Sequence, residues 1–171
     1  MGPDQAARVG PTRVDILNQW TDVEQGLREM RRVSRGPVVV LTLDATALHQ
    51  FWLTDYMPEV VAVEEARFPT LDQVTGILAQ GSAEVRVDVV LVPRDCTDGF
   101  GEAFYARPEA FLQPEVRAAT SGLVLTDPAA VQHGLQRLRQ DLTSGAWDLR
   151  YGHLRAQAER RGAIRLVAAN T

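Results

Sequence analysis

The sequence predicts an α/β fold, in which helices alternate with the strands of an open sheet. Three apolar stretches support this prediction. Residues 38–43 form a continuous apolar run, which is typical of a strand buried on both faces. Residues 84–92 alternate between polar and apolar side chains and then become fully apolar, and residues 163–168 form a third strand near the end of the chain. Helical patterns lie between these strands, as the fold class requires.

The first element is expected to be a helix over residues 22–33. Its apolar face comprises Val23, Leu27, Met30 and Val33. Asp22 can cap its start, and Gly36 and Pro37 end it. The strand that follows needs parallel neighbours and covering helices, yet only 21 residues precede Asp22. We therefore expect this strand to lack a neighbour and to leave one edge unpaired.

Helical patterns account for most of the remaining chain. A helix is expected over residues 45–56, Pro58 interrupts it, and it resumes over residues 59–68. Another helix begins at Thr70 and ends at Gly81. Four more are expected over residues 101–105, 108–112, 114–121 and 128–143. The helical segment before the last strand could return to either side of the sheet, so the sequence leaves the direction of that strand open.

The chain is expected to contain one folded domain. Residues 1–13 are rich in glycine, proline and polar residues, and we expect them to be disordered. Residues 14–171 are expected to form a single α/β domain, in which residues 14–17 form a short strand. A large helical insertion over about residues 98–161 precedes the final strand.

Composition excludes several classes of function. The net charge of −4 argues against nucleic-acid binding, which needs a basic surface. No apolar run approaches the roughly 20 residues that span a bilayer, and no secretory signal is recognisable, so we expect a cytoplasmic protein. The single cysteine, Cys96, excludes an intrachain disulfide and a cysteine-rich zinc site. All 18 basic residues are arginine, which is typical of a GC-rich bacterial genome.

Several stretches resemble the class I S-adenosylmethionine-dependent methyltransferases. Residues 27–37, leading into residues 38–44, are similar to the helix and fifth strand of that family. Residues 18–22 are similar to the segment after the fourth strand in one bacterial subgroup. Three later stretches also resemble that subgroup, at residues 94–100, 145–148 and 151–155. The resemblance covers residues 14–169 and implies a partial Rossmann-like methyltransferase sheet, made of the last strands of a seven-stranded sheet.

The resemblance also implies a cofactor site that this sequence does not contain. In that family a glycine-rich loop and an acidic residue in the first half grip S-adenosylmethionine. The nearest match here is Gly99-Phe100-Gly101, which lacks a third glycine and lies late in the chain. The resemblance therefore implies a truncated methyltransferase for small molecules that does not bind the cofactor well alone and is inactive alone. Asn18 and Trp20 are the candidates for a residual cofactor contact.

Candidate substrate-binding residues follow the first two strands. Ligands of open α/β sheets bind beyond the carboxyl ends of the strands, where Asp44 and Asp95 lie. Either can orient a substrate hydroxyl or amine, or accept its proton. Thr97 and Asp98 belong to the same polar turn. The alternative is that Asp44 caps the helix that follows it, and that Asp95 and Asp98 stabilise the turn.

Two further groups of residues complete the predicted site. His49 lies one helical turn after Asp44 and is a candidate general base, with Asp95 as the second catalytic candidate; an exposed helix residue is the alternative for His49. An apolar lid over a small substrate can be formed by Trp52, Tyr56, Phe100, Phe104 and Tyr105, and core packing is the alternative. The three histidines show no metal-ligand spacing.

Two other classes of function remain open. The chain can be a non-catalytic interaction module, in which the unpaired strand edge binds a partner chain or a second copy. It can also be a distinct small enzyme with a pocket between the helical insertion and the sheet. No nucleic-acid or membrane partner is expected.

Overall fold

A computed structural model of the protein describes residues 17–80 and 84–170. The disorder expected over residues 1–13 and most of the short strand expected over residues 14–17 lie outside this range. Leu17 begins a short 3-10 helix instead, η1 (Leu17–Gln19). Among the described residues, no helix has the length and apolar character needed to cross a bilayer.

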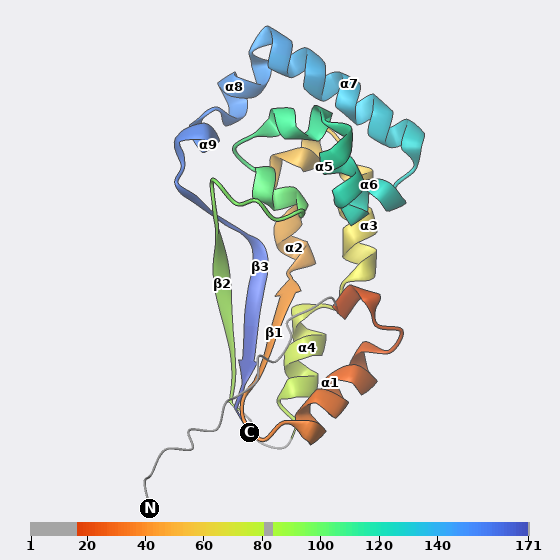
Figure 1. The fold of residues 1–171 in the computed structure, drawn as a ribbon, viewed down its shortest axis with the longest axis vertical. Coiled ribbons are helices and arrows are strands. Elements are labelled where there is room, and N and C mark those ends of the chain that lie inside the picture. Colours follow the sequence, from red (N-terminus) through yellow and green to blue (C-terminus); the bar gives the residue numbers. More distant parts are fainter. Residues whose placement is uncertain (1–16, 81–83, 171) are drawn as a thin grey trace, which may run out of the picture. The chain divides into compact units, whose positions relative to one another are not determined.

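Three strands form one sheet in the order β1-β3-β2, with β1 at Val38–Leu43, β2 at Val85–Pro93 and β3 at Glu159–Ala169. The central strand β3 runs antiparallel to β1, as the arrowheads in Figure 1 show. It is also antiparallel to β2, because the N–H of Asn170, after the end of β3, donates to the carbonyl of Glu84, before the start of β2, at 3.1 Å. The N–H of Asp44 donates to the carbonyl of Ala163 at 2.8 Å, and the N–H of Arg94 donates to the carbonyl of Ala158 at 2.9 Å. These bonds establish the direction of the last strand, which the sequence left open.

The expectations for β1 need correction in two respects. Its hydrogen-bonded neighbour among the described residues is antiparallel, not parallel. Its burial alternates: Val38, Val40 and Thr42 are buried, while the residues between them are half-buried. Because successive side chains of a strand point to opposite faces, only one face of β1 is fully buried. In the described sheet β1 is an edge strand, and pairing of that edge with another chain stays a prediction.

The chain divides into two compact units, which are described separately. Among the described residues, unit 1 comprises 17–42, 69–80, 84–88 and 166–170, and unit 2 comprises 43–68 and 89–165.

Two capped helices pack together in unit 1, and both were expected from the sequence. In α1 (Val23–Val33), Asp22 Oδ1 accepts the N–H of Gln25 at 2.8 Å. In α4 (Leu71–Leu78), Thr70 and Gln73 form a reciprocal capping box. The core of unit 1 consists of Leu17, Leu27, Val38, Val40, Val74, Leu78, Val167 and Ala169. Val33, expected on the packed face of α1, is exposed instead.

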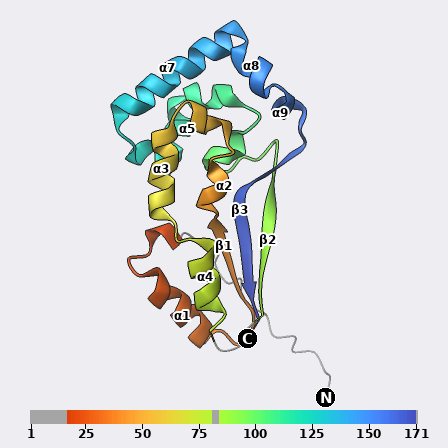
Figure 2. The same cartoon turned by 180° about the vertical axis from the view of Figure 1, so that it is seen from behind.

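Unit 2 is mainly helical. Before β2 it contains α2 (Ala45–Leu48), the 3-10 helix η2 (Trp52–Asp55) and α3 (Pro58–Arg67). Between β2 and β3 it contains η3 (Gly101–Phe104), η4 (Pro108–Leu112), α5 (Pro114–Ala119), α6 (Ser121–Leu125), α7 (Pro128–Ser144), α8 (Ala146–Tyr151) and α9 (His153–Ala156). The segment expected to be a helical insertion is therefore helical (Figure 2).

The helix expected over residues 45–56 is broken into α2 and η2. Phe51 adopts an extended backbone between them, with φ −87° and ψ 129°. This break lets Phe51 and Trp52 both enter the core of unit 2, where each is 3% exposed. Adjacent side chains of a continuous helix point about 100° apart, and the extended backbone at Phe51 changes this relation, so that both rings lie in one core.

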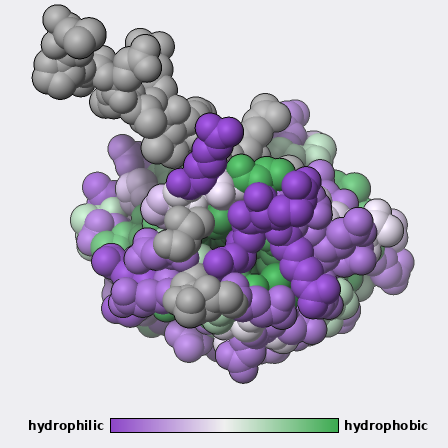
Figure 3. Space-filling model, turned by 90° about the horizontal axis from the view of Figure 1, so that it is seen from below, coloured by the Kyte–Doolittle hydropathy of each residue, from purple (hydrophilic) through white to green (hydrophobic). Residues whose placement is uncertain are grey.

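The face of the molecule that Figure 3 shows is mixed in polarity. On the face seen in Figure 3, small hydrophobic areas are interrupted by hydrophilic side chains.

Candidate functional site

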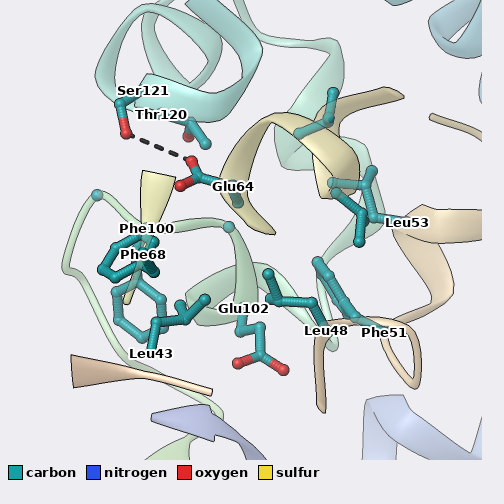
Figure 4. Close-up of a pocket in the computed structure, with 14 residues that line it drawn as sticks. Leu43, Leu48, Phe51, Leu53, Glu64, Phe68, Phe100, Glu102, Thr120 and Ser121 are labelled. Carbon is teal, nitrogen blue, oxygen red and sulfur yellow. Dashed lines mark hydrogen bonds between the residues drawn. The ribbon is translucent and has the colours of Figure 1, made fainter. Parts of the chain in front are cut away.

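A cavity of about 130 Å³ lies within unit 2, at the end of β1 (Figure 4). Its walls come from α2, η2, α3, the segment after β2 and the junction of α5 with α6. The lining residues are Leu43, Leu48, Phe51, Leu53, Val60, Val61, Glu64, Phe68, Gly99, Phe100, Gly101, Glu102, Thr120 and Ser121. Apolar side chains dominate this lining, and its charged members are two glutamates.

Glu64 connects α3 to the start of α6. Its Oε2 lies 3.2 Å from Nη1 of Arg67, and its Oε1 accepts the hydroxyl of Ser121 at 3.4 Å (Figure 4). Burial raises the pKa of Glu64, while Arg67, Ser121 and the N–H of Gly122 act in the opposite direction. The carboxyl of Glu64 is therefore held by hydrogen bonds in a largely apolar setting.

Gly122 allows this approach. A Cβ atom at position 122 would lie 2.4 Å from Oε1 of Glu64, closer than any real contact permits. A side chain at this position would therefore displace the Glu64 carboxylate from the start of α6.

Glu102 is more deeply buried and is bound by its own chain. It is 2% exposed, and its Oε2 accepts the N–H of Ala163 at 2.6 Å. Its Oε1 lies 3.5 Å from Nε of Arg160. Burial raises its pKa, and the contacts with Ala163 and Arg160 oppose that rise. In Figure 4 its carboxylate points away from that of Glu64. Glu102 therefore joins η3 to β3 and leaves Glu64 as the carboxyl closer to the hydroxyl groups of the cavity.

The cavity lacks a positive charge. None of its described lining residues is lysine, arginine or histidine. Arg67 and Arg160 contact the two glutamates but do not line the cavity. A ligand group that carries a negative charge would therefore meet carboxylates without a facing cation.

The predicted residue Asp44 lies next to the cavity but is already bound. It follows the lining residue Leu43 and occupies the N-cap position of α2, where its side chain caps no helix N–H. Its Oδ1 accepts the hydroxyl of Thr46 at 2.6 Å, and its Oδ2 pairs with Arg165 at 2.8 Å. This pair ties the end of β1 to β3.

The predicted turn residues lie outside the cavity lining. Asp95, Thr97 and Asp98 are exposed, and Asp98 accepts the N–H of Gly99 at 2.7 Å. The next four residues of the chain, from Gly99 to Glu102, do line the cavity.

The predicted helix residues also lie outside the lining. His49 is exposed, and its Nε2 lies 2.5 Å from Oε1 of Glu65. Trp52 is buried and donates its indole N–H to the carbonyl of Tyr105 at 2.9 Å. Tyr56 is buried and donates its hydroxyl to Asp141 at 2.7 Å; burial raises the pKa of this phenol. Phe51 and Leu53, on either side of Trp52, line the cavity instead.

The cofactor candidates Asn18 and Trp20 belong to unit 1. The Oδ1 of Asn18 is buried and has no hydrogen-bond partner within the described part of the chain. The indole ring of Trp20 lies against Gly26 of α1. In the described ranges, no group of three acidic, histidine or cysteine side chains is arranged to hold a metal ion.

Sequence reasoning missed the two glutamates and the two hydroxyl residues of the cavity. A signal for Glu64 was present, because it lies four residues after Val60 and three after Val61, on the same inward helical face. The sequence holds no comparable signal for Glu102, whose partners Ala163 and Arg160 are 61 and 58 residues away.

Comparisons with known proteins give one informative likeness. No family model and no curated protein matches the chain. Among solved structures, the chain is similar to a candidate methyltransferase from an antibiotic biosynthesis pathway of Anabaena variabilis ATCC 29413. The two share 31% sequence identity with a TM-score of 0.84, over 92% of this chain. The chain spans 64% of the length of the Anabaena protein.

Proposed function

We propose, from the likeness to the Anabaena protein, that this chain supplies the acceptor side of an S-adenosylmethionine-dependent methyltransferase for small molecules. The observation that carries the proposal is the position of the cavity. The cavity opens beside the carboxyl end of β1. The chain is similar in fold to the candidate methyltransferase and shares 31% sequence identity with it. Ligands of open α/β sheets bind at this edge. The three strands would then be the last strands of a Rossmann-like sheet of class I type.

We infer that the described residues do not hold S-adenosylmethionine by themselves. Unit 1 offers two buried side-chain oxygens without partners in the described ranges, Asn18 Oδ1 and Thr42 Oγ1. An adenosine ribose and an amino-acid group need a carboxylate and a turn of backbone N–H groups instead. At the start of α1, the N–H of Gln25 is already bound by the side chain of Asp22. The role proposed for this chain is therefore to bind, orient and shield the acceptor.

Shielding and orientation are what the cavity is suited to provide. Its apolar walls exclude water, and alignment of two reactants accounts for much of the rate of a methyl transfer. Glu64 and Ser121 supply the polar groups that can orient an acceptor along one direction.

The chain alone is expected not to bind S-adenosylmethionine. Isothermal titration calorimetry should show no saturable heat in the micromolar range, with the folded state checked by amide dispersion in an NMR spectrum. A clear micromolar isotherm would contradict the assignment of this chain to the acceptor side only.

Methyl transfer itself can be tested in a chimera. In it, this chain replaces the matched part of the Anabaena protein, whose remaining segment is kept. The chimera is expected to bind S-adenosylmethionine and to release S-adenosylhomocysteine when small apolar amines or phenols are added. A chimera that binds the donor but transfers no methyl group to any member of such a panel would overturn the proposed function.

A further inference from the structure

The cavity walls define the body of the molecule that fits. They are formed mainly by leucine and phenylalanine side chains, namely Leu43, Leu48, Phe51, Leu53, Phe68 and Phe100. An apolar cavity of about 150 Å³ lined by such residues holds a benzene molecule. The cavity of this protein, at about 130 Å³, therefore suits one six-membered ring or a branched chain of similar size.

The polar groups define the other end of that molecule. Thr120 donates its hydroxyl to the carbonyl of Val116 at 2.9 Å, so its proton is already used. Ser121 accepts from Nη1 of Arg67 at 3.0 Å and donates its hydroxyl proton to Oε1 of Glu64 at 3.4 Å. The groups left to meet a ligand are therefore mainly acceptors. They suit a ligand that donates hydrogen bonds, and best one that carries a positive charge.

Glu64 rather than Glu102 is the group that can meet this donor. Both oxygens of Glu102 face its own chain, at the N–H of Ala163 and the guanidinium of Arg160. An ionised carboxylate has about four acceptor positions, and the contacts of Glu64 with Arg67, Ser121 and Gly122 leave room for one more.

We propose that the cavity binds a small apolar amine, whose ring or branched body contacts the leucine and phenylalanine walls and whose ammonium group binds Glu64. The proposal rests on the proposed function in naming this amine as the methyl acceptor. An ammonium nitrogen must lose a proton before it can accept a methyl group. Glu64 is placed to take that proton on its carboxylate, and burial, which raises its pKa, favours this step.

A purely structural role is the alternative for Glu64. Its pair with Arg67 and its contact with Ser121 would then only tie α3 to α6. Arg67 does not line the cavity, so it leaves the cavity side of the carboxylate open. The two roles differ in their dependence on charge, because a glutamine at position 64 keeps an acceptor oxygen for Ser121 but cannot pair with an ammonium ion.

Three phenyl compounds that differ in charge can separate these roles: cationic benzylamine, its neutral isostere ethylbenzene, and anionic phenylacetate. NMR titration of the ¹⁵N-labelled chain is expected to show that benzylamine shifts the amides of Gly101, Glu102 and Ser121. Glu64→Gln should lower the affinity for benzylamine about tenfold or more, since a charge-assisted hydrogen bond is lost. The same substitution should leave the affinity for ethylbenzene unchanged.

Two further variants provide the controls. Glu65→Gln removes the neighbouring carboxylate, which pairs with His49 and does not line the cavity, and it should bind benzylamine as the parent does. Gly122→Ala should weaken the binding of benzylamine as Glu64→Gln does, because the added Cβ would lie 2.4 Å from Oε1 of Glu64 and displaces the carboxylate. Gly122→Ala thus provides a second test that does not depend on the folding of Glu64→Gln.

The outcomes distinguish the two proposals. If Glu64→Gln and Gly122→Ala bind benzylamine as tightly as the parent, Glu64 has a structural role and the amine assignment fails, while the cavity remains the acceptor site. If phenylacetate binds more tightly than benzylamine, the charge of the ligand has been assigned wrongly. If neither benzylamine nor ethylbenzene shifts the cavity amides, the acceptor site of the proposed function fails as well.

Discussion

Replacing Trp147 by alanine is expected to destabilise unit 2 by about 3–5 kcal/mol, the range for loss of a fully buried aromatic side chain. Trp147 is 0% exposed. Its ring meets that of Trp52 edge-to-face, with centroids 5.5 Å apart, and the guanidinium of Arg155 lies 4.8 Å from its centroid. The substitution removes these contacts and leaves a cavity between α8 and the aromatic core. Urea unfolding, followed by a probe in unit 2, measures the loss.

Leu149 provides a matched control in the same helix. It is 90% exposed, so Leu149→Ala should change stability by no more than about 0.5 kcal/mol. Trp147→Phe should destabilise unit 2 less than Trp147→Ala, because phenylalanine keeps an aromatic ring in the core. The indole N–H has no hydrogen-bond partner in the described structure, so neither substitution breaks such a bond. Equal urea midpoints for Trp147→Ala and Leu149→Ala would show that the core of unit 2 is placed wrongly.

Replacing Glu102 by alanine is expected to destabilise unit 2 by about 3 kcal/mol. The change leaves the N–H of Ala163 without its acceptor and removes the carboxylate from Arg160, whose side chain is 12% exposed. Arg160 keeps a hydrogen bond to the carbonyl of Gln50 at 2.8 Å, which limits the loss. Glu102→Gln keeps an acceptor oxygen for the N–H of Ala163 and should destabilise unit 2 less than Glu102→Ala.

The pH dependence of Glu102→Gln provides an independent check. Burial raises the pKa of Glu102 in the folded state above its ordinary value of 4.5. The folded protein therefore binds this proton more tightly, and the resulting stabilisation is complete below pH 4.5 and lost as the pH rises through the raised pKa. Glutamine does not titrate. Relative to the parent, Glu102→Gln should gain stability as the pH rises from 4.5 towards neutral.

Urea midpoints of the parent and Glu102→Gln across this range measure that difference. A constant difference would mean that Glu102 ionises in the folded protein as it does in the unfolded chain. Glu64→Gln should also gain stability relative to the parent as the pH rises, because burial raises the pKa of Glu64 as well.

Local signals predicted the regular elements well. The helix that begins after Asp22 and the helix that begins after Thr70 were expected from their caps, and both caps form in the structure. Apolar runs predicted all three strands. Each of these signals lies within one element, so it does not depend on the rest of the chain.

Long-range contacts account for what the sequence did not predict. The break at Phe51 depends on the aromatic core that Phe51 and Trp52 enter together. The ion pair that occupies the carboxylate of Asp44 depends on Arg165, which is 121 residues away. Contacts between distant residues leave no periodic pattern in the sequence, so they could not be predicted from spacing alone.

The sequence by itself determined the α/β class, the capped helices of unit 1 and the expected resemblance to methyltransferases, because these depend on local patterns and matched stretches. Only the tertiary structure decided the antiparallel direction of β3, the cavity of unit 2 and the different surroundings of Glu64 and Glu102. The physical reason is that the burial of a carboxylate and its partners depend on chain segments that meet only after folding.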